Sequence, residues 1–360
     1  MRTVHSAAVS FFVACGAIAQ TTHIVGPGGF SQIYEATAVA AAGDVILVHP
    51  GAYFSFAVIR PMTIRAVVPG TVTATGLVTQ ITPALGDEVH LVGLAMTGVL
   101  AGYGRITFDD CRLSGLGTVA FVGFADVHFQ DCTLIPSTST GFPASTCVPL
   151  VADHAYVTAT NTTILGSNFN IAPARPAVSL VASTLHGSHL GVAGGIGAPG
   201  PAAVVADSSS RVYLGDSTVT CDPAACPFSG GSVRVDRCSV SPACGVFAIG
   251  SVLSVRRLLP LQHGQVWSVE FRTAPGQVVG VFASRRLDHT VVPEVEQPVL
   301  LSPVGGWFVG SVVADPSGVA TGSWAIPATP SLVGQALWMQ GVSGTSVPMQ
   351  GSSVVGGVIR

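Results

Sequence analysis

The chain has 360 residues, a formal net charge of −3 and only 9% charged residues. All 15 basic residues are arginine, and they form no basic stripe of the kind that binds nucleic-acid phosphates. At roughly 100–200 residues per domain, the length predicts two domains. The charge of the chain therefore argues against a nucleic-acid partner, and it does not point to any other class of partner.

The first 19 residues are typical of an export signal. Arg2 precedes an apolar segment at residues 7–17, and a small-x-small cleavage sequence ends at Ala19, just before Gln20. The apolar segment is shorter than the ~20 residues that cross a bilayer. We therefore expect residues 1–19 to be removed, the mature chain to have no membrane span, and the protein to be secreted.

An eight-residue pattern recurs between residues 89 and 240. Apolar residues occupy its first, third and eighth places, and every segment except the first has a small residue at the sixth. The segments are residues 89–96, 106–113, 127–134, 157–164, 178–185, 212–219 and 233–240. A step of 21 residues recurs between them, and the stretches 136–155 and 191–210, rich in Pro, Gly and Ser, are predicted to be loops that leave the repeats.

This pattern predicts a parallel β-helix. Alternation on both sides of a two-residue step indicates a strand, a bend and a second strand, with the first, third, sixth and eighth side chains pointing inward. Coils stacked about 4.8 Å apart pair their backbones and join their inner faces into one core. Val127, Phe129, Cys132 and Leu134 should be buried together, and Ile106 should lie beside Val127. We assign the solenoid to residues 20–250.

Residues 28–53, followed by Arg60-Pro-Met-Thr-Ile-Arg-Ala66, resemble the opening of the right-handed parallel β-helix, pectin-lyase-like superfamily. The resemblance implies a short helix over residues 31–42 that covers the open end of the first coil with Ile33, Ala36 and Ala40. It covers residues 28–244. Because that superfamily contains lyases, hydrolases, esterases and non-catalytic proteins, it implies a fold and not an activity.

The repeat ends near residue 250. Strand-like runs follow at residues 266–272, 277–284, 307–313, 319–326 and 336–342. They predict an all-β chain whose second domain, residues 251–360, is a small antiparallel β-sandwich. Residues 315–340 resemble a C-terminal module that is appended to extracellular proteins of environmental bacteria.

The second and fourth places of the repeat point outward and form one polar face. Related enzymes lay an extended polysaccharide along such a face, and the alternative is an outer sheet with solvated side chains. The second place holds His90, Thr107, His128, Thr158, Ser179, Tyr213 and Arg234. The fourth place holds Val92, Asp109, Gln130, Thr160, Val181, Gly215 and Asp236.

We expect a ligand along the middle of this face, with the loop at residues 136–155 as one wall of a groove. Asp153 and His154 at the return of that loop, and Tyr213 and Arg234 farther along the face, are further candidate contacts. The core of the expected ligand site is Thr107, Asp109, His128, Gln130 and Thr158.

Carboxylates recur in the repeat. Asp110, Asp131, Asn161 and Asp216 share the fifth place, where they form either a carboxylate array or a ladder of tight turns. Glycoside hydrolysis uses two carboxylates about 5–9.5 Å apart, which makes Asp109 and Asp131 the candidate catalytic pair. No converging set of oxygen ligands for calcium stands out, so we predict no metal and no cofactor.

Seven cysteines remain after removal of the signal, and secretion allows disulfides. Cys111 and Cys132 occupy the inward sixth place of adjacent coils, where they are either core residues or within disulfide distance. Cys221, Cys226 and Cys244 are near enough in the repeat for a bridge that holds the last coil.

Three functions stay open on this sequence. We favour a secreted, non-catalytic protein that binds extracellular polysaccharide or cell-surface glycan, because acidic residues do not converge. The alternative is a polysaccharide lyase or glycoside hydrolase that uses Asp109 and Asp131. The third is a structural component of the cell surface. The sequence leaves open the glycan, the disulfide pairing, the oligomeric state and the role of the C-terminal domain.

Overall fold

The computed structural model describes residues 20–115, 118–136, 148–166, 175–195, 202–223, 225–242, 247–250 and 252–360. The predicted export signal, residues 1–19, lies outside this part of the chain. Among the described residues, no helix is both long enough and apolar enough to span a membrane.

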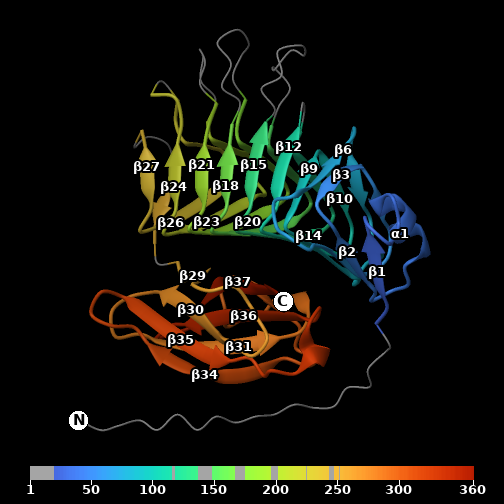
Figure 1. Cartoon of the computed structure of the whole chain (residues 1–360). Coiled ribbons are helices and arrows are strands. Elements are labelled where there is room, and N and C mark those ends of the chain that lie inside the picture. The colour runs from blue at the N-terminus through green and yellow to red at the C-terminus, as the bar shows by residue number, and fades with distance from the viewer. Residues whose placement is uncertain are drawn as a thin grey trace.

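Three long sheets of parallel strands form the sides of a parallel β-helix, as predicted (Figure 1). Sheet A contains β1 (Thr22–Val25), β2 (Val45–Val48), β5 (Met62–Ala66), β8 (Glu88–Val92), β11 (Arg105–Asp109), β14 (Asp126–Gln130), β17 (Tyr156–Thr160), β20 (Thr184–Ser188), β23 (Arg211–Gly215), β26 (Ser232–Asp236) and β28 (Ala248–Ile249). Sheet B contains β3 (Gly51–Phe54), β6 (Val72–Thr75), β9 (Leu94–Thr97), β12 (Arg112–Gly115), β15 (Thr133–Pro136), β18 (Thr163–Leu165), β21 (Gly191–Ala193), β24 (Thr218–Thr220) and β27 (Ser239–Ser241). Sheet C contains β4 (Ala57–Val58), β7 (Thr79–Ile81), β10 (Val99–Gly102), β13 (Ala120–Gly123), β16 (Leu150–Asp153), β19 (Val178–Val181), β22 (Val204–Ala206) and β25 (Phe228–Ser229).

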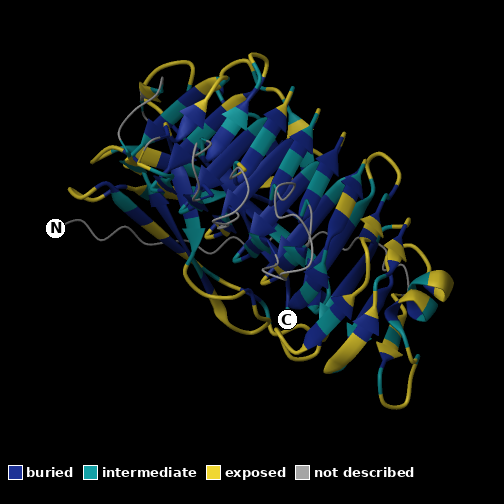
Figure 2. Cartoon of the chain, turned by 90° about the horizontal axis from the view of Figure 1, so that it is seen from above, coloured by how far each residue is buried: buried dark blue, intermediate teal, exposed yellow. Residues whose placement is uncertain are grey.

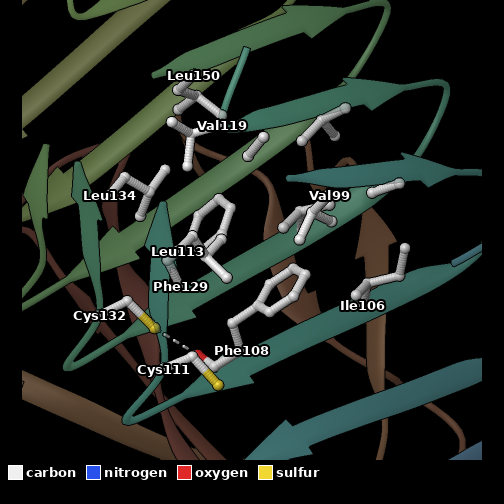
Figure 3. Close-up of a cluster of buried hydrophobic side chains, with 14 of the residues drawn as sticks. Val99, Ile106, Phe108, Cys111, Leu113, Val119, Phe129, Cys132, Leu134 and Leu150 are labelled. Carbon is white, nitrogen blue, oxygen red and sulfur yellow. Dashed lines mark hydrogen bonds between the residues drawn. The ribbon is translucent and has the colours of Figure 1, made fainter. Parts of the chain in front are cut away.

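The predicted stacking of the inner columns is confirmed. Ile106 pairs with Val127, and Val127 pairs with Val157 in the next coil. Val127, Phe129, Cys132 and Leu134 are each at most 2% exposed, and the Phe108 and Phe129 rings stack with centroids 5.1 Å apart (Figure 3). Buried residues follow the strands and exposed residues follow the turns (Figure 2).

Each coil has a third strand that the sequence pattern did not predict. The stretch 136–155, expected to be a loop, contains β16, and the stretch 191–210 contains β21 and β22. Only residues 137–147 and 196–201 of these stretches lie outside the described part of the chain. The reason is that short strands of sheet C bury alternate small or apolar residues, which leaves little contrast with a Gly- and Ala-rich loop.

The predicted repeat segment 178–185 was assigned to the wrong sheet of the solenoid. Val178 belongs to sheet C, and the strand of sheet A in this coil is β20, whose Leu185 pairs with Val157. His186 and Ser188 therefore take the second and fourth outward places that were assigned to Ser179 and Val181.

The predicted capping helix is present as α1 (Ile33–Val39). Ile33, Ala36 and Ala40 are fully buried against the first coil, and α1 contacts β1, β2, β3 and β4. The Gln32 side chain and Glu35 form a capping box that satisfies free N–H groups of the first turn. The helix thus covers the edge of the solenoid.

The fifth place of the repeat is a ladder of tight turns. Asp110, Asp131, Asn161 and Asp216 all have left-handed backbones, with φ between 48° and 56°. Asn and Asp tolerate this conformation better than most residues because their short side chains bond locally. The turn interpretation of these residues is confirmed.

The C-terminal strands form antiparallel sheets. One sheet has the order β29 (Ser254–Arg257), β30 (Val266–Arg272), β35 (Val319–Ala325), and the second has the order β34 (Trp307–Val313), β31 (Val278–Ser284), β36 (Ala336–Ser343), β37 (Gln350–Val358). β32 (Leu287–Thr290) pairs with β33 (Val299–Leu301), and η2 (Pro330–Leu332) is a short 3-10 turn. Trp267 and Phe271 of one sheet and Val281 of the other share a core, as in a sandwich.

Candidate functional site

The C-terminal domain lies along sheet A and covers the face on which a ligand was expected (Figure 1). Its strands β29 and β37 contact β8, β17 and β20. The five residues at the core of the expected site are at most 3% exposed: Thr107, Asp109, His128, Gln130 and Thr158. The expectation of a groove open to solvent is therefore wrong, because a second domain occupies the face.

The two candidate catalytic carboxylates share one arginine of the C-terminal domain. Arg257 Nη2 donates to Asp109 Oδ1 at 2.8 Å and also to Asp131. Arg360 Nη2 lies 3.4 Å from Asp109 Oδ2. The carboxylate of Asp109 is 1% exposed and that of Asp131 is 25% exposed. With both carboxylates paired to a buried cation, neither is free to transfer a proton to or from a substrate in this arrangement.

Polar contacts continue along the covered face. His128 Nδ1 lies 2.5 Å from Thr158 Oγ1, and His128 Nε2 lies 3.4 Å from Gln130 Oε1. Gln130 Oε1 accepts a hydrogen bond from the backbone N–H of Gly356 at 2.9 Å. The side chains expected to bind a ligand thus bind the last strand of the chain itself.

Apolar contacts complete this interface. Trp338 lies under the column of second-place residues, with its ring 6.0 Å from that of His90 and 5.3 Å from that of His128. Trp338 also belongs to an apolar cluster that spans both domains and includes Tyr156, Leu300 and Val354. An interface of this kind makes the two domains one packed unit.

Of the two outer candidates, Arg234 contacts the C-terminal domain and Tyr213 contacts a neighbouring ring of the solenoid. Arg234 forms an ion pair with Glu296, and Tyr213 lies at a ring distance of 6.0 Å from His186. At the other end, Glu88 Oε1 accepts a hydrogen bond from the Leu287 N–H at 3.0 Å. Tyr213 and Arg234 are half-buried, and Arg234 is held by its ion pair with Glu296.

The strands on either side of the loop expected to wall the groove belong to the other two sides of the solenoid. The loop leaves β15 of sheet B and returns in β16 of sheet C, so sheet A is the third side. Residues 137–147 of the loop lie outside the described residues. Asp153 and His154 are therefore separated from the sheet A candidates.

Asp153 and His154 belong to a different surface, at the turns from sheet C to sheet A. Tyr103, Phe124 and His154 occupy the same place in three successive turns, and we call them the aromatic ladder. Ring centroids lie 6.1 Å apart for the first pair and 5.1 Å for the second, with interplanar angles of 20° and 13°. Asp153 Oδ1 lies 2.7 Å from His154 Nδ1.

The aromatic ladder is exposed and is built on unfavourable backbone. Tyr103 and Phe124 are each 55% exposed, and the His154 side chain is 54% exposed. All three residues have φ between 51° and 61°. A left-handed backbone costs residues other than Gly, Asn and Asp roughly 1–2 kcal/mol, so these turns place large flat rings in water where Gly, Asn or Asp would be less strained.

The aromatic ladder could have been found from the sequence, because its three rings recur at one fixed position relative to the repeat. Each ring lies three residues before the first apolar place of a repeat, at Ile106, Val127 and Val157. Sequence reasoning also missed Arg257 and Gly356, which show no pattern that links them to the repeats.

The structure offers little internal space for a ligand at the domain boundary. A crevice lined by Arg105, Asp126, His128, Tyr156 and Asp288 holds about 20 Å³, on the order of one water molecule. No group of three or more His, Cys, Asp or Glu residues within the described ranges could hold a metal ion.

The described cysteines are free thiols. Cys111 and Cys132 are buried in the core, and Cys132 Sγ contacts the Phe108 carbonyl oxygen at 3.3 Å (Figure 3). Cys221 and Cys226 are unpaired as well. Cys244, which was expected near them, lies outside the described residues.

No protein-family model matches the chain, and no curated protein sequence matches it. Among solved structures, the chain is similar to a mutant of a PL6-family alginate lyase, with 14% identity and a TM-score of 0.32. The match covers 64% of this chain and 39% of the lyase chain, so it spans less than half of the lyase's length. This similarity says nothing of activity.

Proposed function

We propose that the protein is secreted and binds an extracellular glycan without cleaving it, through the aromatic ladder and Asp153. The observation that carries the proposal is the stack of three exposed, nearly parallel rings on adjacent coils. The C–H face of a sugar ring is apolar and packs on a flat aromatic ring, while its hydroxyls need a polar partner nearby. The Asp153 carboxylate, 38% exposed, supplies one at the end of the stack.

The geometry of the ladder suits a chain better than a single sugar. Neighbouring coils recur about every 4.8 Å, so the exposed edges of the three stacked rings form a continuous aromatic strip along which an extended oligosaccharide can lie. Exposed rings at a strained backbone are also expected at functional sites, where stability is given up for a contact. Secretion, expected from residues 1–19, would bring such a surface to extracellular polysaccharide.

The arrangement of Asp109 and Asp131 supports a non-catalytic role. A lyase or hydrolase acting through these carboxylates would need the C-terminal domain to leave sheet A and Arg257 to release both of them. Disulfides, which secretion would permit, remain a prediction for this chain.

Glycan retention by the purified mature protein tests the proposal. We expect wild type to be retained on at least one acidic or neutral polysaccharide in affinity electrophoresis, without release of reducing ends or unsaturated products. Phe124→Ala should reduce retention by on the order of tenfold, since the middle ring of the ladder is lost together with the packing of ~1 kcal/mol or more that orients its two neighbours. Asp153→Asn should reduce retention less.

Phe308→Ala is the matched control, because Phe308 is a 58% exposed aromatic residue of the C-terminal domain. It should leave retention unchanged. Retention that survives Phe124→Ala, or that Phe308→Ala abolishes, would place the binding surface elsewhere. Product release by wild type would contradict the non-catalytic part of the proposal.

A further inference from the structure

Three histidines lie in one outward column of sheet A, directly beneath the C-terminal domain. His90, His128 and His186 occupy the second place of every other coil, and Thr107 and Thr158 alternate with them. Their exposed fractions are 8%, 2% and 0%. Since sheet A is a side of the solenoid, these rings are shielded from water by the docked domain.

The buried surroundings of these three rings favour the neutral form of the imidazole over the charged form. His90 Nδ1 and both ring nitrogens of His186 have no hydrogen-bond partner among the described residues. Burial lowers the pKa of all three histidines from 6.5 to about 4. The hydrogen bond between His128 and Gln130 raises the pKa of His128, but by less than burial lowers it.

Some charged groups around the histidine column favour a protonated imidazole and others disfavour it. Beside His90, Glu88 Oε2 lies 3.8 Å from Nε2, and Arg105 in turn lies 3.2 Å from Glu88. Near His128, the positive charge of Arg257 disfavours an imidazolium and the negative charge of Asp131 favours it.

Other charged groups lie at the edge of the column. From the C-terminal domain, Asp288 and His289 approach Asp126 at the boundary crevice, and Arg286 acts on Glu88. The neighbour of His186 on the next coil is the Tyr213 ring.

We propose that the C-terminal domain is an acid-releasable cover of sheet A, which undocks when His90, His128 and His186 take up protons. Undocking exposes the polar face of sheet A and leaves the solenoid folded. A cluster of buried neutral histidines at an interface is the arrangement by which proteins convert mild acidity into separation of two surfaces.

The sign follows from linkage between protonation and docking. A histidine whose pKa is lower in the docked form leaves docking unaffected above pH 6.5 and weakens it as the pH falls toward 4. Glu88 acts in the opposite direction, because burial raises its pKa from 4.5 to about 7 and docking then gains as the pH falls. Burial raises the pKa of Asp126 in the same sense as Glu88.

The pKa of each histidine is shifted about as far as that of Glu88, so three histidines outweigh Glu88. Each histidine shifts the docking equilibrium toward release by on the order of tenfold at about pH 5. We therefore expect release, on balance, below about pH 6.

Small-angle X-ray scattering of the purified mature chain, with circular dichroism, tests this inference between about pH 7.5 and pH 4.5. The maximum dimension should increase reversibly on acidification while the β-sheet signal is kept. A triple variant with His90→Gln, His128→Gln and His186→Gln should stay compact throughout. His154→Gln, which changes an exposed histidine away from the interface, should open like wild type.

A second measurement does not depend on the variant folding. Hydrogen exchange at the imidazole C2 position, followed by mass spectrometry on wild type, should give titration midpoints for His90, His128 and His186 well below 6.5. Midpoints near 6.5 for the three buried rings would overturn the inference. So would a wild-type chain that stays compact at about pH 4.5, a triple variant that opens like wild type, or expansion that occurs only with loss of the β-sheet signal.

Discussion

Arg257 and Asp109 form an ion pair across the domain boundary, with Nη2 and Oδ1 2.8 Å apart and side-chain exposures of 7% and 1%. Arg257 lies in β29, the first strand of the C-terminal domain, and Asp109 ends β11 of the solenoid. The ion pair explains how the Asp109 carboxylate can be buried in the interface between the two domains. It also makes Asp109 a residue that holds two domains together.

We expect Arg257→Met to lower the free energy of unfolding by about 3 kcal/mol, because the buried Asp109 carboxylate then keeps only the weaker contact with Arg360. Replacing both partners, as Arg257→Met with Asp109→Leu, should recover part of this loss, since the two most buried charges are both removed and the Asp131 carboxylate that loses Arg257 is 25% exposed. Urea denaturation followed by tryptophan fluorescence measures both.

Arg112→Met is the control for the arginine, because Arg112 is exposed on sheet B. Its effect should stay within about 0.5 kcal/mol. An equal effect of Arg112→Met and Arg257→Met would show that the boundary pair does not stabilise the protein.

Phe129→Ala should destabilise the solenoid by about 3–5 kcal/mol, through lost burial and a cavity beside Phe108. Phe54→Ala removes a ring that is 65% exposed and should cost far less. Thermal melting by circular dichroism compares the two. Similar losses for both variants would contradict the stacked core.

Cysteine reactivity should follow burial. In native protein, Cys226 should be alkylated rapidly, whereas Cys111 and Cys132 should react only after unfolding, because both are buried and burial raises the pKa of the Cys132 thiol well above its ordinary value. Peptide mapping by mass spectrometry after iodoacetamide treatment measures this. If Cys111 and Cys132 resist alkylation even after unfolding without reductant, they are paired in a disulfide.

Glu88→Gln should raise stability at about pH 8 and have little effect at acid pH. The pKa of folded Glu88, about 7, lies above its ordinary value of 4.5, so its stabilising contribution is present at acid pH and is lost as the pH rises through 7. Glutamine carries no charge and still accepts from the Leu287 N–H. The gain should be about 3 kcal/mol at most, which corresponds to the shift of the Glu88 pKa from 4.5 to about 7.

The unfolding free energies of Glu88→Gln and wild type, measured at about pH 8 and at acid pH, test this prediction. Glu294→Gln, at an exposed site, should give the same difference from wild type at both. A stability of Glu88→Gln that tracks wild type at all pH values would show that Glu88 titrates like a solvated carboxylate.

The solenoid was predictable because its information is local and repeated. Inward apolar places, the left-handed turns at Asp110 and Asp131, and the helix with Ile33 and Ala36 each follow from short-range sequence periodicity. The same logic failed at Val178, because a strand of sheet C shows the same alternation as a strand of sheet A. The true strand contains Gly187 in place of a large inward residue.

Only the tertiary structure shows that the polar face of sheet A is covered by the C-terminal domain. Outward residues such as Thr107, His128 and Gln130 have the same sequence pattern whether they face water or a second domain. The strand that covers them, β37, is Gly- and Ser-rich and was not predicted as a strand. Its contact with Gln130 joins backbone and side chain 226 residues apart, a distance over which no sequence periodicity specifies docking.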